Sequence, residues 1–203
     1  VIWYQRSPEM YASYIQGYNF AKRSLENNLA HKKYKQKKNA VVLDLDETVL
    51  DNSPYEAWLY DNNKIFESAT WNNWVQDEDA ELVPGVADFL RYANTSGCEI
   101  FYVSNRNKHT QTEATLNNLR KFDLPCSDTF HLLLKDTTIT GDSGKERRRR
   151  LIEDEYNFEI LLLCGDQVAD YDKAFDAVRG LSESQVKDSL NKYSDFFGSR
   201  FVI

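Results

Sequence analysis

The chain has 203 residues, of which 41% are hydrophobic and 28% are charged. A chain of this length buries roughly 70% of the surface that its unfolded form exposes, so we expect one domain that folds without a disulfide framework or a structural metal. The 32 acidic residues outnumber the 25 basic ones, and the net charge of −7 argues against nucleic acid as the main partner. No hydrophobic run approaches the roughly 20 residues that span a bilayer, so no transmembrane segment is predicted.

The three cysteines, Cys98, Cys126 and Cys164, lack the spacing of a zinc site. An odd number of cysteines allows at most one disulfide, and the sequence leaves the pairing open. Cys164 lies in a hydrophobic run and is expected in the core. The chain begins at Val1 without a charged and apolar leader, which indicates a processed or trimmed product.

The first predicted element is a long helix that runs to about Lys33. Ser7 suits the capping position, Pro8 the first helical position, and Glu9 places an acid in the first turn. Hydrophobic residues then recur at steps of three and four and form one apolar face: Tyr11, Tyr14, Ile15, Tyr18, Ala21, Leu25 and Leu29.

Three hydrophobic runs, at residues 40–43, 100–103 and 160–164, predict strands that are covered on both faces. Helical patterns at residues 86–93, 110–121 and 145–155 alternate with them. This order predicts a Rossmann-like α/β fold, in which helices flank a parallel sheet. Further strands are expected at residues 131–134 and 200–203, and a capping box at residues 182–185 predicts a helix that runs to about Tyr193.

Residues 52–84 break this alternation, because they contain Trp58, Tyr60, Trp71 and Trp74 without a clear strand. Loops of this length are uncommon in compact domains unless they are functional. We therefore predict a small helical cap, made of the N-terminal helix and this insert after the first strand. The expected organisation is an N-terminal helical segment at 1–39 that packs with the cap, and an α/β core at 40–203.

Polar residues follow the three main predicted strands. They are Asp44, Asp46 and Thr48 after the first, Ser104 and Asn105 after the second, and Asp166 and Asp170 after the third. Carboxyl ends of parallel strands meet at one edge of the sheet, where ligands bind. Carboxylates gathered there repel one another unless a cation lies between them, and oxygen donors without Cys or His suit Mg²⁺. Ser104 and Lys145 add a hydroxyl and a positive charge that would suit phosphate oxygens.

These residues resemble the four motifs of the haloacid dehalogenase superfamily of phosphotransferases. The counterparts are DxDxT at Asp44, Asp46 and Thr48, a serine at Ser104, a lysine at Lys145, and GDxxxD at Asp166 and Asp170. All four stand in the family's order, each at a predicted strand end or helix start. The resemblance implies a HAD-like fold.

A closer resemblance is to the bacterial class C acid phosphatases of the outer-membrane lipoprotein e type. It covers nearly the whole chain and rests on the residues 2–7 and Tyr11, 44–48, 50–52, Trp71, Trp74, 84–85 and 103–106. Family members continue past the last strand into a tail whose aromatic residue helps to line the substrate pocket, whereas this chain stops at Ile203. The resemblance implies that the protein is located in the bacterial cell envelope or is secreted. It is also compatible with a homodimer.

The resemblance implies a Mg²⁺-dependent phosphomonoesterase of the acid phosphatase or 5′-nucleotidase type, acting on small phosphate monoesters that include nucleoside monophosphates. Asp44 would be the nucleophile, and Asp46 would be the acid and base. Asp44, the main-chain carbonyl of Asp46, and Asp166 would bind Mg²⁺, with Asp170 in support. The implied phosphate-binding residues are Ser104, Asn105, Lys145 and Thr48. Trp71 is the first candidate for stacking on a nucleobase, with Tyr55, Trp58 and Trp74 as alternatives.

Two other functions remain open at this stage. The first is a small protein phosphatase of the same superfamily, because such enzymes share the DLDET string of residues 44–48 and act on phosphoserine. The second is a non-catalytic storage or binding protein on the same fold, as the plant vegetative storage proteins resemble these phosphatases. A run of four arginines at residues 147–150 is predicted to be solvated and to form salt bridges with Glu153, Asp154 or Glu155, because consecutive residues spread around a helix.

Overall fold

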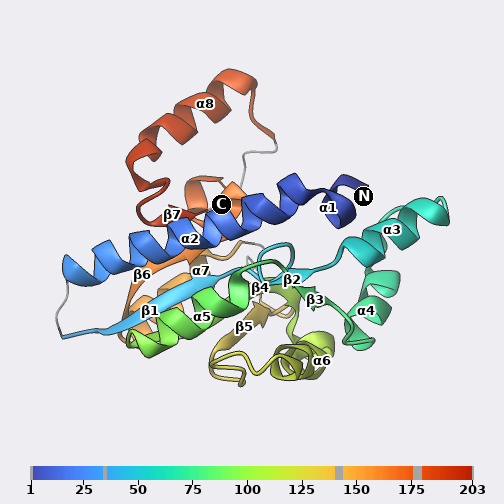
Figure 1. Cartoon of the computed structure of the whole chain (residues 1–203), viewed down its shortest axis with the longest axis horizontal. Helices are drawn as coiled ribbons and strands as arrows, with labels where there is room; N and C mark the ends of the chain where they lie inside the picture. Colours follow the sequence, from blue (N-terminus) through green and yellow to red (C-terminus); the bar gives the residue numbers. More distant parts are fainter. Residues whose placement is uncertain (1, 34–35, 140–143, 176–179, 203) are drawn as a thin grey trace.

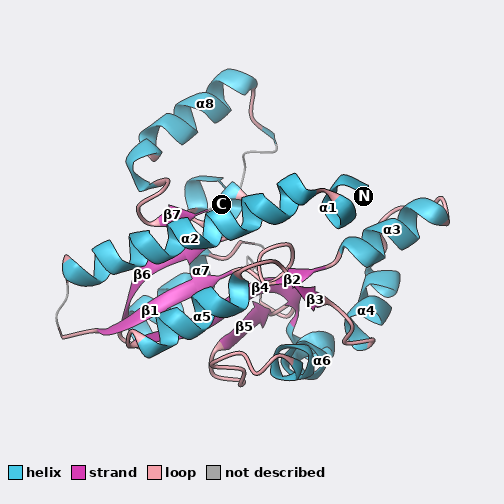
Figure 2. Cartoon of the chain, in the orientation of Figure 1, coloured by secondary structure: helices cyan, strands magenta, loops and turns pink. Residues whose placement is uncertain are grey.

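A five-stranded parallel sheet forms the centre of the computed structural model, which describes residues 2–33, 36–139, 144–175 and 180–202. The strand order is β5-β4-β1-β6-β7 (Figures 1 and 2). The strands are β1 (Lys38–Leu43), β4 (Cys98–Asn107), β5 (Leu132–Lys135), β6 (Phe158–Cys164) and β7 (Phe201–Val202). The predicted parallel α/β fold is therefore confirmed.

Each face of the sheet has its own hydrophobic core, because successive side chains of β1 point in opposite directions. Val41 and Leu43 belong to the core beneath α2 (Pro8–Ala30), α5 (Val86–Thr95) and α6 (Lys108–Lys121). Ala40 and Val42 belong to the other core, beneath the segment that follows α7 (Glu146–Arg150).

The second face is covered by short helical pieces instead of long helices. A π-helical turn (Leu151–Glu155) directly continues α7. Between β6 and β7, the described residues include the 3₁₀ turns Val168–Asp170, Lys173–Phe175 and Ser194–Phe196, and α8 (Glu183–Lys192). The predicted capping box begins α8, with both of its reciprocal hydrogen bonds formed between Ser182 and Gln185.

The long N-terminal helix begins as predicted but ends three residues early. The Ser7 hydroxyl accepts hydrogen bonds from the backbone N–H groups of Glu9 and Met10 at 3.2 and 3.3 Å. The apolar face of α2, with Tyr18, Ala21 and Leu25 buried, lies against the sheet. The short α1 (Ile2–Arg6) contacts the insert through α3. The N-terminal segment thus packs mainly on the sheet, because its widest apolar face is used there.

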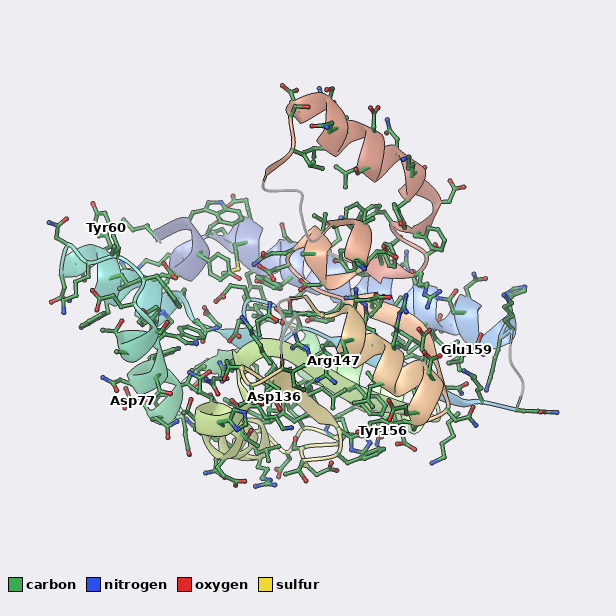
Figure 3. The ribbon with its side chains drawn as sticks, turned by 180° about the vertical axis from the view of Figure 1, so that it is seen from behind. Tyr60, Asp77, Asp136, Arg147, Tyr156 and Glu159 are labelled. Carbon is green, nitrogen blue, oxygen red and sulfur yellow. The ribbon has the colours of Figure 1, made fainter. Side chains whose placement is uncertain are left out.

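The insert after β1 is helical, as predicted. It contains α3 (Ser53–Asp61) and α4 (Ser68–Gln76), closed at the base by an antiparallel pair of two-residue strands, β2 (Leu50–Asp51) and β3 (Glu81–Leu82). Figure 1 shows both helices at one end of the molecule, away from α8. Figure 3 labels Tyr60 and Asp77, which mark the ends of α3 and α4. Because α4 also packs against α6, the insert is held beside the carboxyl edge of the sheet.

The three cysteines are free thiols. Cys98 and Cys164 are buried, as the hydrophobic run around Cys164 predicts, and Cys126 is half-buried. Within the described ranges, no helix is both long and apolar enough to cross a membrane.

Candidate active site

A tight loop after β1 carries the first two candidate carboxylates. The carbonyl of Leu45 accepts hydrogen bonds from the backbone N–H groups of Val49 and Leu50, each at 2.8 Å, which closes the loop. Glu47 takes a left-handed conformation, with φ of 60°, and this reverses the chain between Asp46 and Leu50. The loop thereby turns the chain back toward the insert.

Two tyrosines of α2 hold this loop from outside. The Tyr14 hydroxyl donates to the carbonyl of Glu47 at 2.7 Å, and the Tyr18 hydroxyl donates to the carbonyl of Thr48. Burial raises the pKa of the Tyr14 hydroxyl to about 12, so it stays a neutral donor across the physiological range. Packing of α2 on the sheet therefore fixes the main chain on which Asp44 and Asp46 stand.

Three carboxylates meet where β1 and β6 end. One oxygen each of Asp44, Asp166 and Asp170 lie within 4.8 Å of one another. Lys145, at the start of α7, is 5% exposed; its ammonium contacts Asp44 and lies 2.7 Å from Asp170. The approach of Asp170 needs a glycine at position 165, because a Cβ there would lie 2.4 Å from an Asp170 oxygen.

The electrostatics of this cluster favour an added cation. Burial raises the pKa of Asp44 well above its usual range; Lys145 opposes this rise, while Asp170 and Asp46 add to it. Burial, with the charge of Asp170, also raises the pKa of Asp166 to about 6. Burial disfavours the charged Lys145, but Asp44 and Asp170 outweigh it and raise its pKa. One ammonium does not balance three carboxylates, so negative charge is left over.

The donor chemistry of the cluster fits Mg²⁺. Each of the three clustered groups offers hard carboxylate oxygens, and no Cys or His belongs to this cluster in the described part of the chain. Asp44 and Asp166 are in place to bind such an ion, with Asp170 beside them between Lys145 and Gly165.

Asp46 is held by a separate set of partners. Arg106 donates from Nη2 and Nε to Oδ1 of Asp46, at 2.8 and 3.0 Å. Nδ2 of Asn52 donates to the same oxygen at 3.1 Å, and the Ser104 hydroxyl donates to Oδ2 at 3.1 Å. Arg106 is 3% exposed, and its Nη1 also donates to Thr115 at 3.1 Å. The two candidate catalytic carboxylates therefore lie in different surroundings.

The predicted phosphate-binding residues lie at this same edge of the sheet. Ser104 is fully buried and its hydroxyl is engaged with Asp46. Asn105 is exposed, and its side-chain oxygen accepts a hydrogen bond from Arg148 at 2.7 Å. Thr48 differs from Ser104 and Asn105, because its buried hydroxyl has no hydrogen-bond partner among the described residues. It lines a cavity of about 250 Å³ beneath α2.

The insert brings its aromatic residues to the side of Asp46. Trp71 lies over the guanidinium of Arg106, 5.6 Å from the ring centre, and the Trp74 indole N–H donates to Oδ1 of Asn52 at 2.8 Å. Tyr55 is buried and packs edge-on against Trp71, whereas Trp58 is 40% exposed on the outer side of Tyr55. A polar groove of about 680 Å³ runs from Trp71 to Asn105, so Trp71 borders an open space beside the site.

Residues 1–194 match the family model "HAD superfamily, subfamily IIIB (Acid phosphatase)". The chain belongs to this family of acid phosphatases. Two solved structures of the class C acid phosphatase from Bacillus anthracis, one with tungstate bound, align over 100% of this chain and 80% of theirs, at 36% and 37% identity and a TM-score of 0.88. The predicted resemblance to class C acid phosphatases and the HAD-like fold are confirmed.

A curated relative is more distant. "Acid phosphatase 1" of Solanum lycopersicum is 24% identical over 133 residues, which make up 64% of this chain and 50% of that protein. The chain thus spans about half the length of this curated relative.

The prediction for the arginine run was wrong for two of its members in this member of the acid phosphatase family. Arg148 and Arg149 are 1% and 4% exposed. Arg148 donates to the carbonyl of Ser104, and Arg149 donates to the carbonyl of Asp170 at 2.6 Å. The carboxylate partner of Arg149 is Glu146, at 3.0 Å. One side of α7 faces the site, so Arg148 and Arg149 hold the main chain behind it, whereas Arg147 and Arg150 are exposed as predicted.

Sequence reasoning also missed the roles of Arg106 and Asn52. Arg106 stood in the motif string 103–106, and Asn52 followed the first motif closely, but neither carried an assigned role. The available signal was their place in two of the strings that carry the resemblance, 50–52 and 103–106.

Proposed function

We propose that this member of the acid phosphatase family hydrolyses small phosphate monoesters in a Mg²⁺-dependent reaction through an aspartyl-phosphate on Asp44. The observation that carries the proposal is the contrast at the end of β1. Asp44 lies with Lys145 in the carboxylate cluster, while Asp46, two residues on, lies outside it under Arg106. A nucleophile and a proton carrier need such different surroundings.

In the first step, an oxygen of Asp44 bonds to phosphorus as the bond from phosphorus to the ester oxygen breaks. The proton on Asp46 passes to that departing oxygen. Lys145, already in contact with Asp44, offsets charge on the phosphoryl oxygens, and Asn105 lies exposed beside them. The class C acid phosphatase of Bacillus anthracis binds tungstate, a tetrahedral oxyanion like phosphate, which supports a phosphoryl site here.

In the second step, a water molecule loses a proton to Asp46 while its oxygen bonds to phosphorus, and the bond to Asp44 breaks. The cycle returns both aspartates to their starting states. Asp44, Asp166 and the main-chain carbonyl of Asp46 would hold Mg²⁺, which when bound supplies positive charge beside the phosphoryl oxygens. Phosphoryl transfer depends mainly on such positioning and neutralisation.

The proposed substrates include nucleoside monophosphates, with Trp71 stacking on the base. The groove beside Trp71 is lined by amide side chains, among them Asn72 and Gln111, and by Lys135. Its described lining residues include no carboxylate, so it suits a polar leaving group with a flat ring. Location in the cell envelope and dimer formation stay predictions from the resemblance.

A substrate panel tests the function and the stacking together. Wild type should hydrolyse a 5′-nucleotide and a small alkyl phosphate, lose both activities with EDTA and regain them with Mg²⁺. Trp71→Ala should lower kcat/KM for the nucleotide about tenfold more than for the alkyl phosphate, because only the base stacks. Equal losses on both substrates would reject stacking, and hydrolysis of a phosphoserine peptide in preference to both would favour a protein phosphatase.

A further inference from the structure

A chain of hydrogen bonds leads from the insert to Asp46. The Trp74 indole N–H donates to Oδ1 of Asn52 at 2.8 Å, and Nδ2 of Asn52 donates to Oδ1 of Asp46 at 3.1 Å. Asn52 is 1% exposed and Trp74 is half-buried, so water competes little for the amide between them. Trp74 belongs to α4, while Asp46 stands on the loop after β1.

The Asn52 amide is held from both ends: Trp74 donates to its oxygen, and its nitrogen has Asp46 as its nearest acceptor, with Glu47 Oε2 and the carbonyl of Leu50 each at 3.5 Å. An indole N–H can only donate, so it requires the amide oxygen of Asn52 on its own side. The amide nitrogen of Asn52 must then point to Asp46, where it donates to the carboxylate. Without the indole N–H, the buried amide oxygen of Asn52 loses this donor, and the amide is free to turn out of line with Asp46.

The two oxygens of Asp46 are unequally held. Oδ1 accepts from Asn52 and from both Nε and Nη2 of Arg106, which are rigid planar donors. Oδ2 accepts from the Ser104 hydroxyl at 3.1 Å and, at 3.3 Å, from Nε of Arg106. A hydroxyl can rotate away about one bond, whereas a buried guanidinium cannot. The Asp46 side chain is 23% exposed, which leaves it within reach of a substrate.

We propose that Asn52 and Trp74 are positioning residues for proton transfer, which hold Oδ1 of Asp46 so that Oδ2 exchanges the proton. This inference rests on the proposed function. Oδ2 gives its proton to the ester oxygen as the bond to phosphorus breaks, and later takes a proton from the attacking water. Trp74 acts through Asn52, so it contributes to the reaction without stacking on the substrate.

Leaving-group dependence separates this role from a structural one. An alkyl oxygen leaves poorly unless it receives a proton, whereas p-nitrophenolate leaves without one. The test is therefore to measure kcat/KM for ethyl phosphate and for p-nitrophenyl phosphate, because kcat/KM reports the first irreversible step. Trp74→Phe keeps an aromatic ring but lacks the N–H, and Asn52→Ala removes the amide. Each should lower kcat/KM for ethyl phosphate about tenfold and for p-nitrophenyl phosphate less than about twofold.

A double variant tests whether Trp74 acts through Asn52. Adding Trp74→Phe to Asn52→Ala should cause no further loss on ethyl phosphate, because the link is already broken. Additive losses would overturn the proposal, as would equal losses on the two substrates or no loss on ethyl phosphate. Trp3→Phe, at a 58% exposed position of α1, is the matched control and should behave as wild type.

The failure of this proposal can be told from failure of the proposed function. A wild-type protein without Mg²⁺-dependent hydrolysis of p-nitrophenyl phosphate would reject the function, and the positioning role with it. An active wild type whose folded variants lose both substrates equally would reject the positioning role alone. Circular dichroism reports folding, and the Asn52→Ala comparison stands by itself if Trp74→Phe does not fold.

Discussion

Single side chains give two carboxylates that are separated by one residue different surroundings, and the roles that we propose for them follow from these surroundings. Asp44 shares Lys145 with Asp170, whereas Asp46 shares none of these partners and lies under Arg106. The assignment of nucleophile to Asp44 and proton carrier to Asp46 thus rests on contacts that the DxDxT string alone does not describe.

A glycine beside the cluster offers a sharp test at this scale. Gly165→Ala would place a Cβ 2.4 Å from an oxygen of Asp170 and force that carboxylate to move. Because Asp170 lies beside Asp44 and Asp166, we expect the Mg²⁺ concentration for half-maximal activity to rise about tenfold. A Mg²⁺ titration of activity measures this.

The control for that variant is Gly180→Ala, where a Cβ meets no described atom within 4 Å. It should leave the titration unchanged. A Gly165→Ala protein with the wild-type Mg²⁺ titration would show that the position of Asp170 does not matter for metal binding.

The site residues that sequence could predict are those that directly follow buried strands. Asp44 and Asp166 belong to this group, because the carboxyl ends of parallel strands share one edge; Ser104 was predicted on the same ground but lies inside β4, which continues to Asn107. The burial of Arg106 and Arg148 could not be predicted, since arginine is normally exposed and its burial depends on partners far along the chain. Each of these two is buried because it holds a motif segment: Arg106 the carboxylate of Asp46, and Arg148 the carbonyl of Ser104.

At the scale of elements, the alternation of strands and helices was enough to predict the parallel sheet. The pair β2 and β3 escaped prediction because each strand has only two residues, too short to show a period. The placement of α2 on the sheet was not predicted either, because an apolar face on a helix does not indicate which other surface will cover it. Long-range packing decides both features.

A histidine links β4 to the loop before β5 and makes stability depend on pH. Nδ1 of His131 lies 2.9 Å from both carboxylate oxygens of Asp128, and Nε2 lies 3.0 Å from Glu99. Burial lowers the pKa of His131, but its hydrogen bonds to Cys126, Glu99 and Asp128 outweigh this and raise the pKa to about 9 from its ordinary value of 6.5.

The folded protein therefore holds this proton more tightly than the unfolded chain. The stabilisation is fully present below pH 6.5 and is lost as the pH rises to about 9. We expect the free energy of unfolding to fall by roughly 1–2 kcal/mol over this range, with allowance for solvent screening at a half-buried site.

Urea unfolding at the two ends of this pH range measures the change, with His131→Gln for comparison. The variant should lack most of the pH dependence. If both proteins lose the same free energy, other groups carry the effect.

At the scale of the whole molecule, a net charge of −7 surrounds a site that would hold Mg²⁺ and Lys145. The local charge suits a small phosphate monoester, while the overall charge repels a long polyanion. We expect kcat/KM for a 5′-phosphorylated oligonucleotide to be well below that for a mononucleotide at low salt. The gap should narrow several-fold at about 0.5 M salt, where charges beyond a few ångströms are screened.

The mononucleotide serves as the internal control in this comparison, since it carries the same reacting group. A ratio of the two kcat/KM values that does not change with salt would mean that steric access, and not net charge, decides between them.

The most direct test of the account is hydrolysis of p-nitrophenyl phosphate by wild type and Asp44→Asn in the presence of Mg²⁺. Asp170 still pairs with Lys145 in the variant, so the fold should persist, as circular dichroism would show. Wild type should hydrolyse the substrate, and this hydrolysis should stop on addition of EDTA. The kcat of Asp44→Asn should be lower by at least about 10³-fold, because no nucleophile remains. Equal turnover by the two folded proteins would contradict the assignment of Asp44 as the nucleophile.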